Sequence, residues 1–344
     1  MSLNSFIRAM PKVELHVHVE GSIRPETLLK LARRNQVELP ADTVEGLRQW
    51  YTFTDFPHFV EIYIALTNCI RTPEDLELIF REFLEGQAAQ NIRHTEATYT
   101  AFTVFELSGI PFEVQMQAIN RAREWAKQAL GVTLALIVDI AREVEPAVGM
   151  VTAEWVKEWR GRGVEALGLG GYEVGYPPER HTEALKLAQA AGVPCILHAG
   201  ETEGPASIWG ALKAGKSIRI GHGVRCLEDE ALVAELRARQ IPLEVCPTSN
   251  VCLKVVPTLA QHPLPRLLNA GLYVTINSDD PPMFNTTLTD EYVRVAETFG
   301  FGAAELEQFV LNALRASLLS EAERAALEAE FVAEFTRLRE EHLA

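Results

Sequence analysis

Short apolar runs alternate with amphipathic segments along most of the 344-residue chain. The apolar runs have the length and composition of buried strands, and the segments between them have helical periodicity. We predict strands near residues 12–21, 92–99, 132–141, 164–170, 194–198, 217–221, 241–246 and 272–277, and helices near 25–32, 111–130 and 147–160 and from about residues 179, 206, 228, 262 and 288. Eight strand-helix units close a parallel barrel, so we expect an α/β fold of the TIM barrel type, (β/α)8.

Two regions depart from this alternation. Residues 36–90 contain helical segments and an aromatic cluster at 50–59, which predicts a helical insertion after the first strand. The insertion is either a cover over an active site, with Phe53, Phe56 and Phe59 as candidate apolar contacts, or a small subdomain with its own core. Residues 303–343 predict two charged amphipathic helices outside the barrel. Without a linker or a repeat, we expect residues 1–344 to form one domain.

Polar residues stand at the ends of several predicted strands, where apolar residues would be expected. His16 and His18 are separated by one residue, so in a strand both imidazoles point to the same face. His198, His222 and Asp279 end later runs in the same way. Because the active site of a TIM barrel lies at the carboxyl ends of its strands, these side chains are expected to converge. Taken alone, the first pair could equally be two hydrogen-bonded core histidines.

The converging residues have the chemistry of a metal site. His16, His18, His198 and Asp279 would supply three nitrogens and one oxygen to a single Zn²⁺, with a water completing the site. We therefore expect one zinc ion per chain, which would generate hydroxide near neutral pH.

Three further residues are candidates for the chemistry itself. Glu201 follows His198 by three residues on a glycine-containing turn, which suits a general acid or base, although a charge at a helix N-terminus would look the same. His222 lies between two glycines and could orient or deprotonate the metal-bound water, or could be a satisfied core histidine. Asp279 and Asp280 are adjacent, so alternation points their side chains in different directions.

The composition of the chain limits the kinds of molecule that it could bind. The formal charge of −15 argues against nucleic acid or an acidic membrane surface, although a small neutral nucleobase could still be a substrate. No run approaches the length of a membrane span, the N-terminus lacks a signal core, and the five scattered cysteines include no CxxC pair. We expect a cytoplasmic protein with reduced thiols, and the oligomeric state is not indicated.

The chain resembles the adenosine deaminase family of the metal-dependent amidohydrolase superfamily. The motifs that carry the resemblance are PKVELHVHVEGS at 11–22, HAGE at 198–201, RIGHGVR at 219–225, EVCPTSN at 244–250 and NSDDP at 277–281. The resemblance implies a TIM barrel, zinc bound by the four residues named above, and hydrolytic deamination of a purine nucleoside. It further implies that Glu201 protonates a purine ring nitrogen, that His222 and Asp279 steer the hydroxide, and that Asp280 and the backbone of Gly171 hold the base.

One difference from many adenosine deaminases bears on the substrate. They have Asp where this chain has Glu20, a position that resembles a ribose contact, and their GDE segment appears here as Gly171-Tyr172-Glu173. FTDF at 53–56, GLGG at 168–171 and NSDDPPMF at 277–284 look most like the bacterial branch that deaminates aminodeoxyfutalosine on the way to menaquinone. Arg225 or Lys254 could then meet the benzoate of such a substrate, or both could be solvated surface charges. Adenosine and adenine deaminases are the alternatives within the family.

Two other classes of protein were considered. A two-metal hydrolase needs a bridging carboxylate or a modified lysine from the fourth strand, where the chain has no lysine but does have Glu173. A non-catalytic binding protein would have lost one of the ligand or acid/base residues, and all of them are present.

Overall fold

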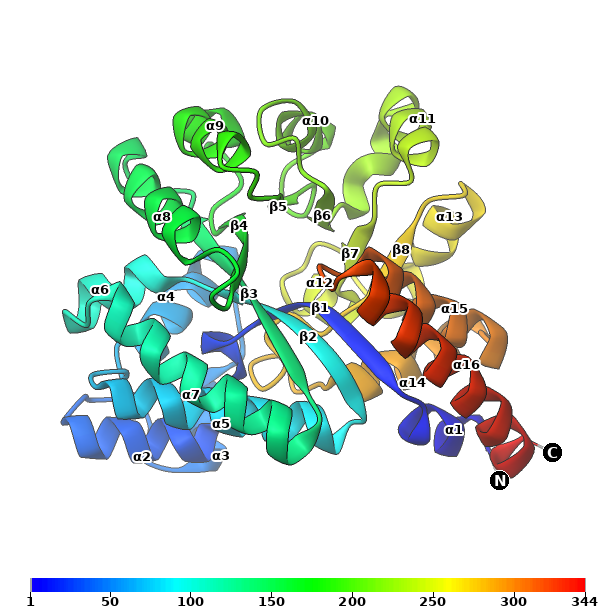
Figure 1. Ribbon diagram of the computed structural model, residues 1–344, viewed down its shortest axis with the longest axis horizontal. Helices are drawn as coiled ribbons and strands as arrows, with labels where there is room; N and C mark the ends of the chain where they lie inside the picture. Colours follow the sequence, from blue (N-terminus) through cyan, green and yellow to red (C-terminus); the bar gives the residue numbers. More distant parts are fainter. Residues whose placement is uncertain (1, 344) are drawn as a thin grey trace.

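A ring of eight parallel strands forms the centre of the computed structural model, which describes residues 2–343. The strands pair in chain order, β1 with β2 and so on to β8, as the sequence predicts (Figure 1). Their bounds are β1 Lys12–His18, β2 Ile92–Tyr99, β3 Thr133–Ala141, β4 Val164–Gly170, β5 Cys195–Ala199, β6 Arg219–His222, β7 Leu243–Val245 and β8 Val274–Ile276. The barrel prediction is confirmed, and the strand positions agree to within a few residues at each end.

Helices surround the ring on the outside (Figure 1). Those that follow the strands are α7 Phe112–Leu130, α8 Pro146–Trp159, α9 Thr182–Ala190, α10 Pro205–Lys213, α11 Glu230–Arg239, α13 Leu264–Asn269 and α14 Leu288–Phe299. Helices α15 Ala303–Ala316 and α16 Glu321–His342 form the predicted C-terminal pair. The sequence reading missed three short helices, α1 Leu3–Ala9, α6 Ala101–Ser108 and α12 Pro247–Cys252.

The last and first strands are joined by a short seam at the end of β8. Val17 and Asp279 form a parallel bridge. The amide of His18 donates to the carbonyl of Asp279 at 2.8 Å, and the amide of Asp279 donates to the carbonyl of His16 at 3.1 Å. Side chains reinforce this seam, because Glu14 accepts from the amide of Ser278 at 3.1 Å. The backbone that closes the ring therefore belongs to the predicted metal ligands.

A buried charge network crosses the interior of the barrel. Arg219 is 1% exposed, and its guanidinium contacts Glu96 at 2.6 Å and Glu244 at 2.5 Å. Its third contact is the carbonyl of Ala316 at 2.9 Å, at the end of α15. Carboxylates on both sides compensate the buried cation, which would otherwise be costly. The network fixes Glu244 next to the metal-ligand candidates.

The predicted insertion, residues 36–90, consists of α3 Val44–Trp50, α4 Phe56–Thr67 and α5 Pro73–Ala89, and the predicted helix α2 Pro25–Asn35 precedes it. Asp55 caps the N-terminus of α4, because its carboxylate accepts from the amide of His58 at 2.9 Å. Phe59 on this helix stacks on Phe284, which follows β8, with ring centres 5.6 Å apart. These contacts hold α4 over the carboxyl end of the barrel. Among residues 2–343, no helix combines the length and apolar character needed to cross a membrane.

Candidate active site

A cavity of about 300 Å³ lies at the carboxyl ends of the strands, under α4. Side chains of the barrel form its floor, and Phe56, Phe59 and Ile64 of α4 form part of its wall. Besides Phe56 and Phe59, the predicted site residues among its lining are His18, Gly171, His198, Glu201, His222, Asp279 and Asp280. The structure therefore brings together seven candidates from five strand ends.

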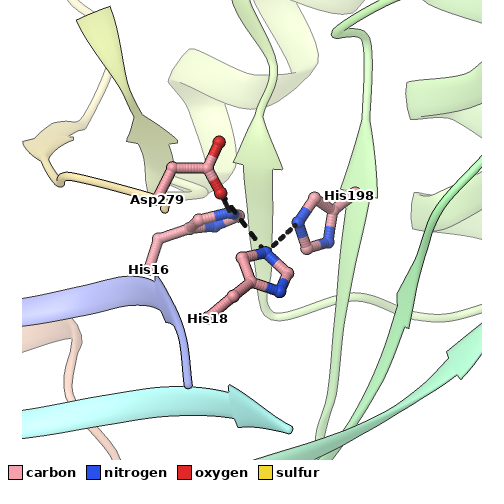
Figure 2. A group of neighbouring side chains, drawn as sticks. All are labelled: His16, His18, His198 and Asp279. Atoms are coloured by element: carbon pink, nitrogen blue, oxygen red, sulfur yellow. Dashed lines mark hydrogen bonds and ion pairs between the residues drawn. The ribbon is translucent and has the colours of Figure 1, made fainter. Parts of the chain in front are cut away.

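Four side chains form a compact cluster at the cavity floor. His16, His18, His198 and Asp279 each offer a ligand atom, and these atoms all lie within 4.8 Å of one another. Figure 2 shows the carboxylate of Asp279 and the two imidazoles of β1 turned toward the ring of His198. Nε2 of His18 lies 3.1 Å from Nε2 of His198 and 3.3 Å from Oδ1 of Asp279.

These spacings fit a single metal ion. Two ligand atoms that each lie about 2.0–2.1 Å from one zinc ion are roughly 3–4 Å apart. Nε2 of His16 lies 3.5 Å from Oδ1 of Asp279 and is buried without a hydrogen-bond partner among the described residues. An orphaned imidazole nitrogen beside a carboxylate and two further imidazoles is what a metal ion would satisfy.

Hydrogen bonds fix the tautomers of two of the ligands. Nδ1 of His16 lies 2.9 Å from Glu244, and Nδ1 of His198 lies 3.1 Å from the carbonyl of Leu169. Each Nδ1 therefore donates, which leaves each Nε2 lone pair free for the metal. Burial, followed by the nearby His16 and His18 rings, lowers the pKa of His198 well below its usual range, so its imidazole stays neutral.

A second grouping, His16, His222, Cys246 and Asp279, is also close enough to hold a metal. Burial, together with the nearby carboxylates, raises the pKa of Cys246 well above its usual range, and a protonated thiol is a poor ligand. His222 is a poor ligand in this grouping too, because its Nε2 carries a proton. The three-histidine set is therefore the better metal site.

The protonation of His222 follows from a chain of hydrogen bonds. The amide of Leu264 donates to Nδ1 of His262 at 3.1 Å, so Nε2 of His262 donates to Oδ1 of Asn250 at 3.1 Å. The amide nitrogen of Asn250 then donates to Nδ1 of His222 at 3.3 Å. Nε2 of His222 carries the remaining proton, and it lies 3.7 Å from Oε1 of Glu201 and 3.8 Å from Oδ2 of Asp279. Of the two expected roles, orienting the attacking oxygen fits this tautomer and deprotonating water does not.

His222 and Asp279 also share an unusual backbone conformation. Their φ angles are +60° and +64°, in the left-handed region that side chains other than glycine rarely adopt. Such residues persist where surrounding contacts hold them, and they cluster at functional sites. For Asp279 those contacts include the seam to β1 and the hydroxyl of Ser249, which donates to Oδ2 at 2.6 Å.

Glu201 lies on a loop that is held by another carboxylate. The side chain of Glu173 accepts from the amides of Gly200, Glu201, Thr202 and Glu203, at 3.1 Å from Glu201 and 2.8 Å from each of the next two. Because its carboxylate is engaged by these amides, Glu173 is not available to bridge two metal ions, as a two-metal hydrolase would require. Glu201 is 6% exposed and its Oε1 faces the cavity without a partner in the described chain. Burial, followed by the nearby Asp279, raises the pKa of Glu201 well above its usual range, which suits a proton donor.

The residues expected to hold a base also line the cavity. Oδ1 of Asp280 has no hydrogen-bond partner within residues 2–343. A β-carbon at Gly21 would lie 1.7 Å from this oxygen, so the glycine is required for Asp280 to fit. Gly171 has φ +87° and presents its backbone to the cavity.

Several expected contacts are not where the sequence reading placed them. Glu20 is fully buried outside the cavity lining, and its oxygens accept from the hydroxyl of Tyr63 at 3.0 Å and the amide of Thr100 at 2.9 Å. Phe53 packs behind the wall against Phe284 rather than on the cavity. The periodicity of β1 does not extend to Glu20, because the chain turns into a 3-10 helix at Glu20–Ser22.

The two cations predicted at the mouth are engaged elsewhere. Arg225 contacts Glu228 at 2.7 Å and the carbonyl of Thr202 at 2.8 Å. Lys254 donates to the carbonyl of Thr54. Within residues 2–343, the cavity lining includes no lysine or arginine. Neither side chain lines the cavity, which favours the alternative that both are surface charges.

The sequence reading also missed residues that matter to the site. Glu244 orients His16, and Asn250, held by His262, orients His222. The cavity lining also includes Asp139 and Glu143. The signal available for Glu244 and Asp139 was an acidic residue inside an otherwise apolar strand. No comparable signal in the sequence indicated Asn250 or His262, because both lie outside strands.

A parallel barrel with a buried three-histidine, one-aspartate cluster, a buried glutamate and a covering helix is the arrangement of a metal-dependent hydrolase. The model of the family described as adenosine deaminase matches residues 11–334. The chain belongs to the adenosine deaminase family, and it is a deaminase that acts on a purine-type substrate.

Known proteins resemble the chain over nearly its whole length. It is 40% identical over 331 residues to an aminodeoxyfutalosine deaminase of Streptomyces avermitilis, covering 95% of this chain and 92% of the relative. The crystal structure of an adenine deaminase from Arthrobacter aurescens matches with a TM-score of 0.89 at 34% identity, covering 96% and 99% of the two chains. The structure of an amidohydrolase from Burkholderia ambifaria with bound zinc matches with a TM-score of 0.91 at 29% identity, covering 98% and 93%.

Proposed function

We propose that this chain hydrolytically deaminates a 6-aminopurine nucleoside and releases ammonia, with aminodeoxyfutalosine as the leading substrate. The observation that carries the proposal is the placement of Glu201. Its unpartnered Oε1 faces the cavity and lies 3.7 Å from Nε2 of His222, beside the four-residue metal cluster. A proton donor, an orienting donor and a metal site meet at one point of a purine-sized cavity.

The metal proposed for the cluster is zinc, one ion per chain, held by His16, His18, His198 and Asp279. The ligand spacings and the zinc-containing structural neighbour support this choice. When bound, zinc supplies a water molecule that ionises near neutral pH.

The protein groups then carry the proton transfers. Glu201 donates its proton to the ring nitrogen next to the carbon that bears the amine, which makes that carbon electrophilic. Nε2–H of His222 orients the attacking oxygen, and Oδ2 of Asp279 receives its proton. A carbon–oxygen bond forms, the proton on Asp279 passes to the amine, and the carbon–nitrogen bond breaks to release ammonia. The proton of the new hydroxyl returns to Glu201 as the carbonyl forms, which restores the acid. Asp280 and the backbone of Gly171 hold the base during these steps.

The choice of aminodeoxyfutalosine rests on two supports. The Streptomyces avermitilis relative that is 40% identical carries this name. The cavity also extends beyond the cluster along an apolar wall formed by Phe56, Ile64, Leu107 and Val144, which suits an aromatic tail. This substrate would place the chain in menaquinone biosynthesis by the futalosine route.

The described lining contains no cationic side chain, which bears on where the carboxylate of the substrate's benzoate group would lie. A benzoate carboxylate inside the cavity would meet no positive side chain, and burying it unpaired would be costly. We therefore place the carboxylate at the open end of the cavity, in water. Selectivity for the tail then comes from burial of its ring.

Adenine deamination is the second candidate. The Arthrobacter aurescens structure that matches over 96% of this chain is an adenine deaminase. An adenosine deaminase remains the third option within the family.

Substrate profiling of the purified protein tests the proposal. Ammonia release is followed with aminodeoxyfutalosine, adenosine and adenine, and Glu201→Gln serves as the inactive control. We expect kcat/KM for aminodeoxyfutalosine to exceed that for adenosine by roughly 10–10²-fold, the value of burying one aromatic ring. Equal values for the two nucleosides would refute the substrate assignment, and no turnover of any 6-aminopurine would refute the activity.

A further inference from the structure

Four carboxylates on the cavity wall have an oxygen that is buried and without a hydrogen-bond partner in the part of the chain that the structure describes. They are Asp139, Glu143, Glu201 and Asp280. The proposed reaction uses Glu201 and Asp280. It leaves Asp139 and Glu143 without a role.

Asp139 is the more deeply buried of the two. It lies near the carboxyl end of β3, is 3% exposed, and its Oδ1 has no partner within residues 2–343. Its register neighbour on β4 is Gly168. A β-carbon at Gly168 would lie 2.7 Å from Asp139, and one at Gly170 would lie 2.9 Å from its Oδ2. Two glycines of β4 thus leave space for this carboxylate, whose Oδ1 has no partner among the described residues.

Glu143 follows four residues later and flanks the position proposed for the base. A β-carbon at Gly171 would lie 2.7 Å from Oε2 of Glu143, the oxygen that has no partner in the described structure. In the proposed function the backbone of Gly171 meets the base, so Glu143 lies beside the base, within reach of a group attached to it. Asp139 and Glu143 are then the unpaired acceptors that a sugar on this base could reach.

We propose that Asp139 and Glu143 accept hydrogen bonds from the sugar hydroxyl groups of the substrate, and that they select nucleosides over free adenine. This inference rests on the proposed function and deepens it. A buried acceptor without a donor costs free energy, and a bound hydroxyl removes that cost. Free adenine has no hydroxyl group to offer, so it leaves both acceptors unpaired.

The charge of the wall favours hydroxyl donors over other sugar substituents. The described lining supplies Asp139, Glu143 and Glu106 and no cationic side chain, so a phosphate group on the sugar would be repelled. A neutral hydroxyl satisfies a carboxylate without adding charge. The substrate class is therefore an unphosphorylated 6-aminopurine nucleoside.

A cycle of substrate and protein changes tests the inference. The substrates are adenosine, 2′-deoxyadenosine, 3′-deoxyadenosine and adenine, and the proteins are the wild type, Asp139→Leu and Glu143→Met. Some of these substrates lack a hydroxyl that donates to Asp139 or Glu143. For the wild type, we expect kcat/KM to be roughly 10–10²-fold lower with such a substrate. In the variant that lacks the matching carboxylate, the absence of the same hydroxyl should lower kcat/KM by less than about threefold.

Glu106→Met is the matched control, because Glu106 lines the cavity but is exposed. It should leave the effect of each hydroxyl unchanged. Metal content and melting temperature are measured for every variant, and Asp139→Asn takes the place of Asp139→Leu if the latter does not fold.

Two results would overturn the inference. One is an equal effect of hydroxyl removal in the wild type and in both variants, and the other is a wild-type preference for adenine over adenosine. Either result leaves the deaminase activity in place. Failure of the proposed function would show differently, as no ammonia release from any of these substrates or from aminodeoxyfutalosine.

Discussion

The amide nitrogen of Asn250 lies 3.3 Å from Nδ1 of His222, so it donates a hydrogen bond to that ring nitrogen. His262 determines this direction, because its Nε2 donates to the amide oxygen of Asn250 and so leaves the amide nitrogen for His222. Burial lowers the pKa of His262 to about 4 and that of His222 to about 3, so both rings stay neutral. The proton of His222 is thereby fixed on Nε2, facing the cavity.

Replacing Asn250 by aspartate should reverse the proton position on His222. A carboxylate accepts from both histidines, so Nδ1 of His222 becomes the protonated nitrogen and Nε2 can no longer donate. We expect kcat to fall roughly 10²–10⁴-fold, the cost of losing a correctly placed proton donor. Long-range ¹H–¹⁵N correlation spectra of histidine-labelled protein, recorded with and without metal, would report the tautomer directly. An unchanged His222 tautomer in Asn250→Asp would contradict this assignment.

The loop that carries Glu201 should loosen when Glu173 is replaced by glutamine. One amide oxygen cannot replace two carboxylate oxygens that accept from four successive amides. We expect kcat to fall by roughly 10²-fold while the metal is retained, since hydrogen bonds to a charged group are each worth roughly 1.5–3 kcal/mol. Hydrogen exchange at residues 200–203 should accelerate in the variant. Glu183→Gln, at an exposed glutamate of α9, is the control.

Elemental analysis should find one divalent metal per chain, with zinc predominant. His18→Ala should lose the metal because the cluster then keeps only three ligands, whereas His58→Ala, outside the cluster, should keep it. Chelation of the metal should lower the melting temperature and abolish ammonia release. Two tightly bound ions per chain would show that the single-site assignment is wrong.

Glu201→Gln should retain the metal and lose turnover. The glutamine occupies the same volume but cannot give a proton, so we expect kcat to fall by at least roughly 10²–10⁴-fold. Near-normal turnover in a metal-replete sample of this variant would remove Glu201 from the mechanism.

Lys12 should make the stability of the protein depend on pH. Burial, followed by repulsion from Arg8, lowers the pKa of this amine from 10.5 to about 7 in the folded chain. Between these two values the unfolded chain binds a proton that the folded chain lacks, so this residue costs stability as the pH falls through that interval. Lys12→Met removes the cost and loses the hydrogen bonds to Met10 and Gln90.

The gain in unfolding free energy from Lys12→Met should therefore be larger at about pH 7 than at about pH 10, by roughly 2–4 kcal/mol. Urea unfolding at the two pH values measures it. Lys30→Met, at an exposed position of α2, should show no such difference. A gain that is independent of pH would contradict the lowered pKa.

The pattern of apolar and polar residues predicted the barrel well, because each strand is determined by residues that are close together in the sequence. Alternating apolar runs and amphipathic segments depend on neighbours in sequence, and polar residues at strand ends are brought together by the fold itself. His16, His18, His198 and Asp279 were predicted on this basis, and the structure places them in one cluster.

The misassigned residues depend on contacts between distant segments. Glu20 points away from the cavity because the chain turns after β1, and Lys254 is held by the carbonyl of Thr54 in the insertion. Likewise, Asn250 is oriented by His262, which is twelve residues further along the chain. No local pattern determines such pairings, because several partners within reach satisfy the same side chain equally well.

The seam between β8 and β1 sets the order in which this enzyme becomes active during synthesis. His16 and His18 leave the ribosome early, but the strand that closes the ring ends only at Ile276, and Asp279 follows it. The backbone of Asp279 completes the barrel, and its side chain completes the ligand set. A chain that stops short of this residue has neither a closed ring nor a full set of ligands, so we expect partial products of translation to be inactive.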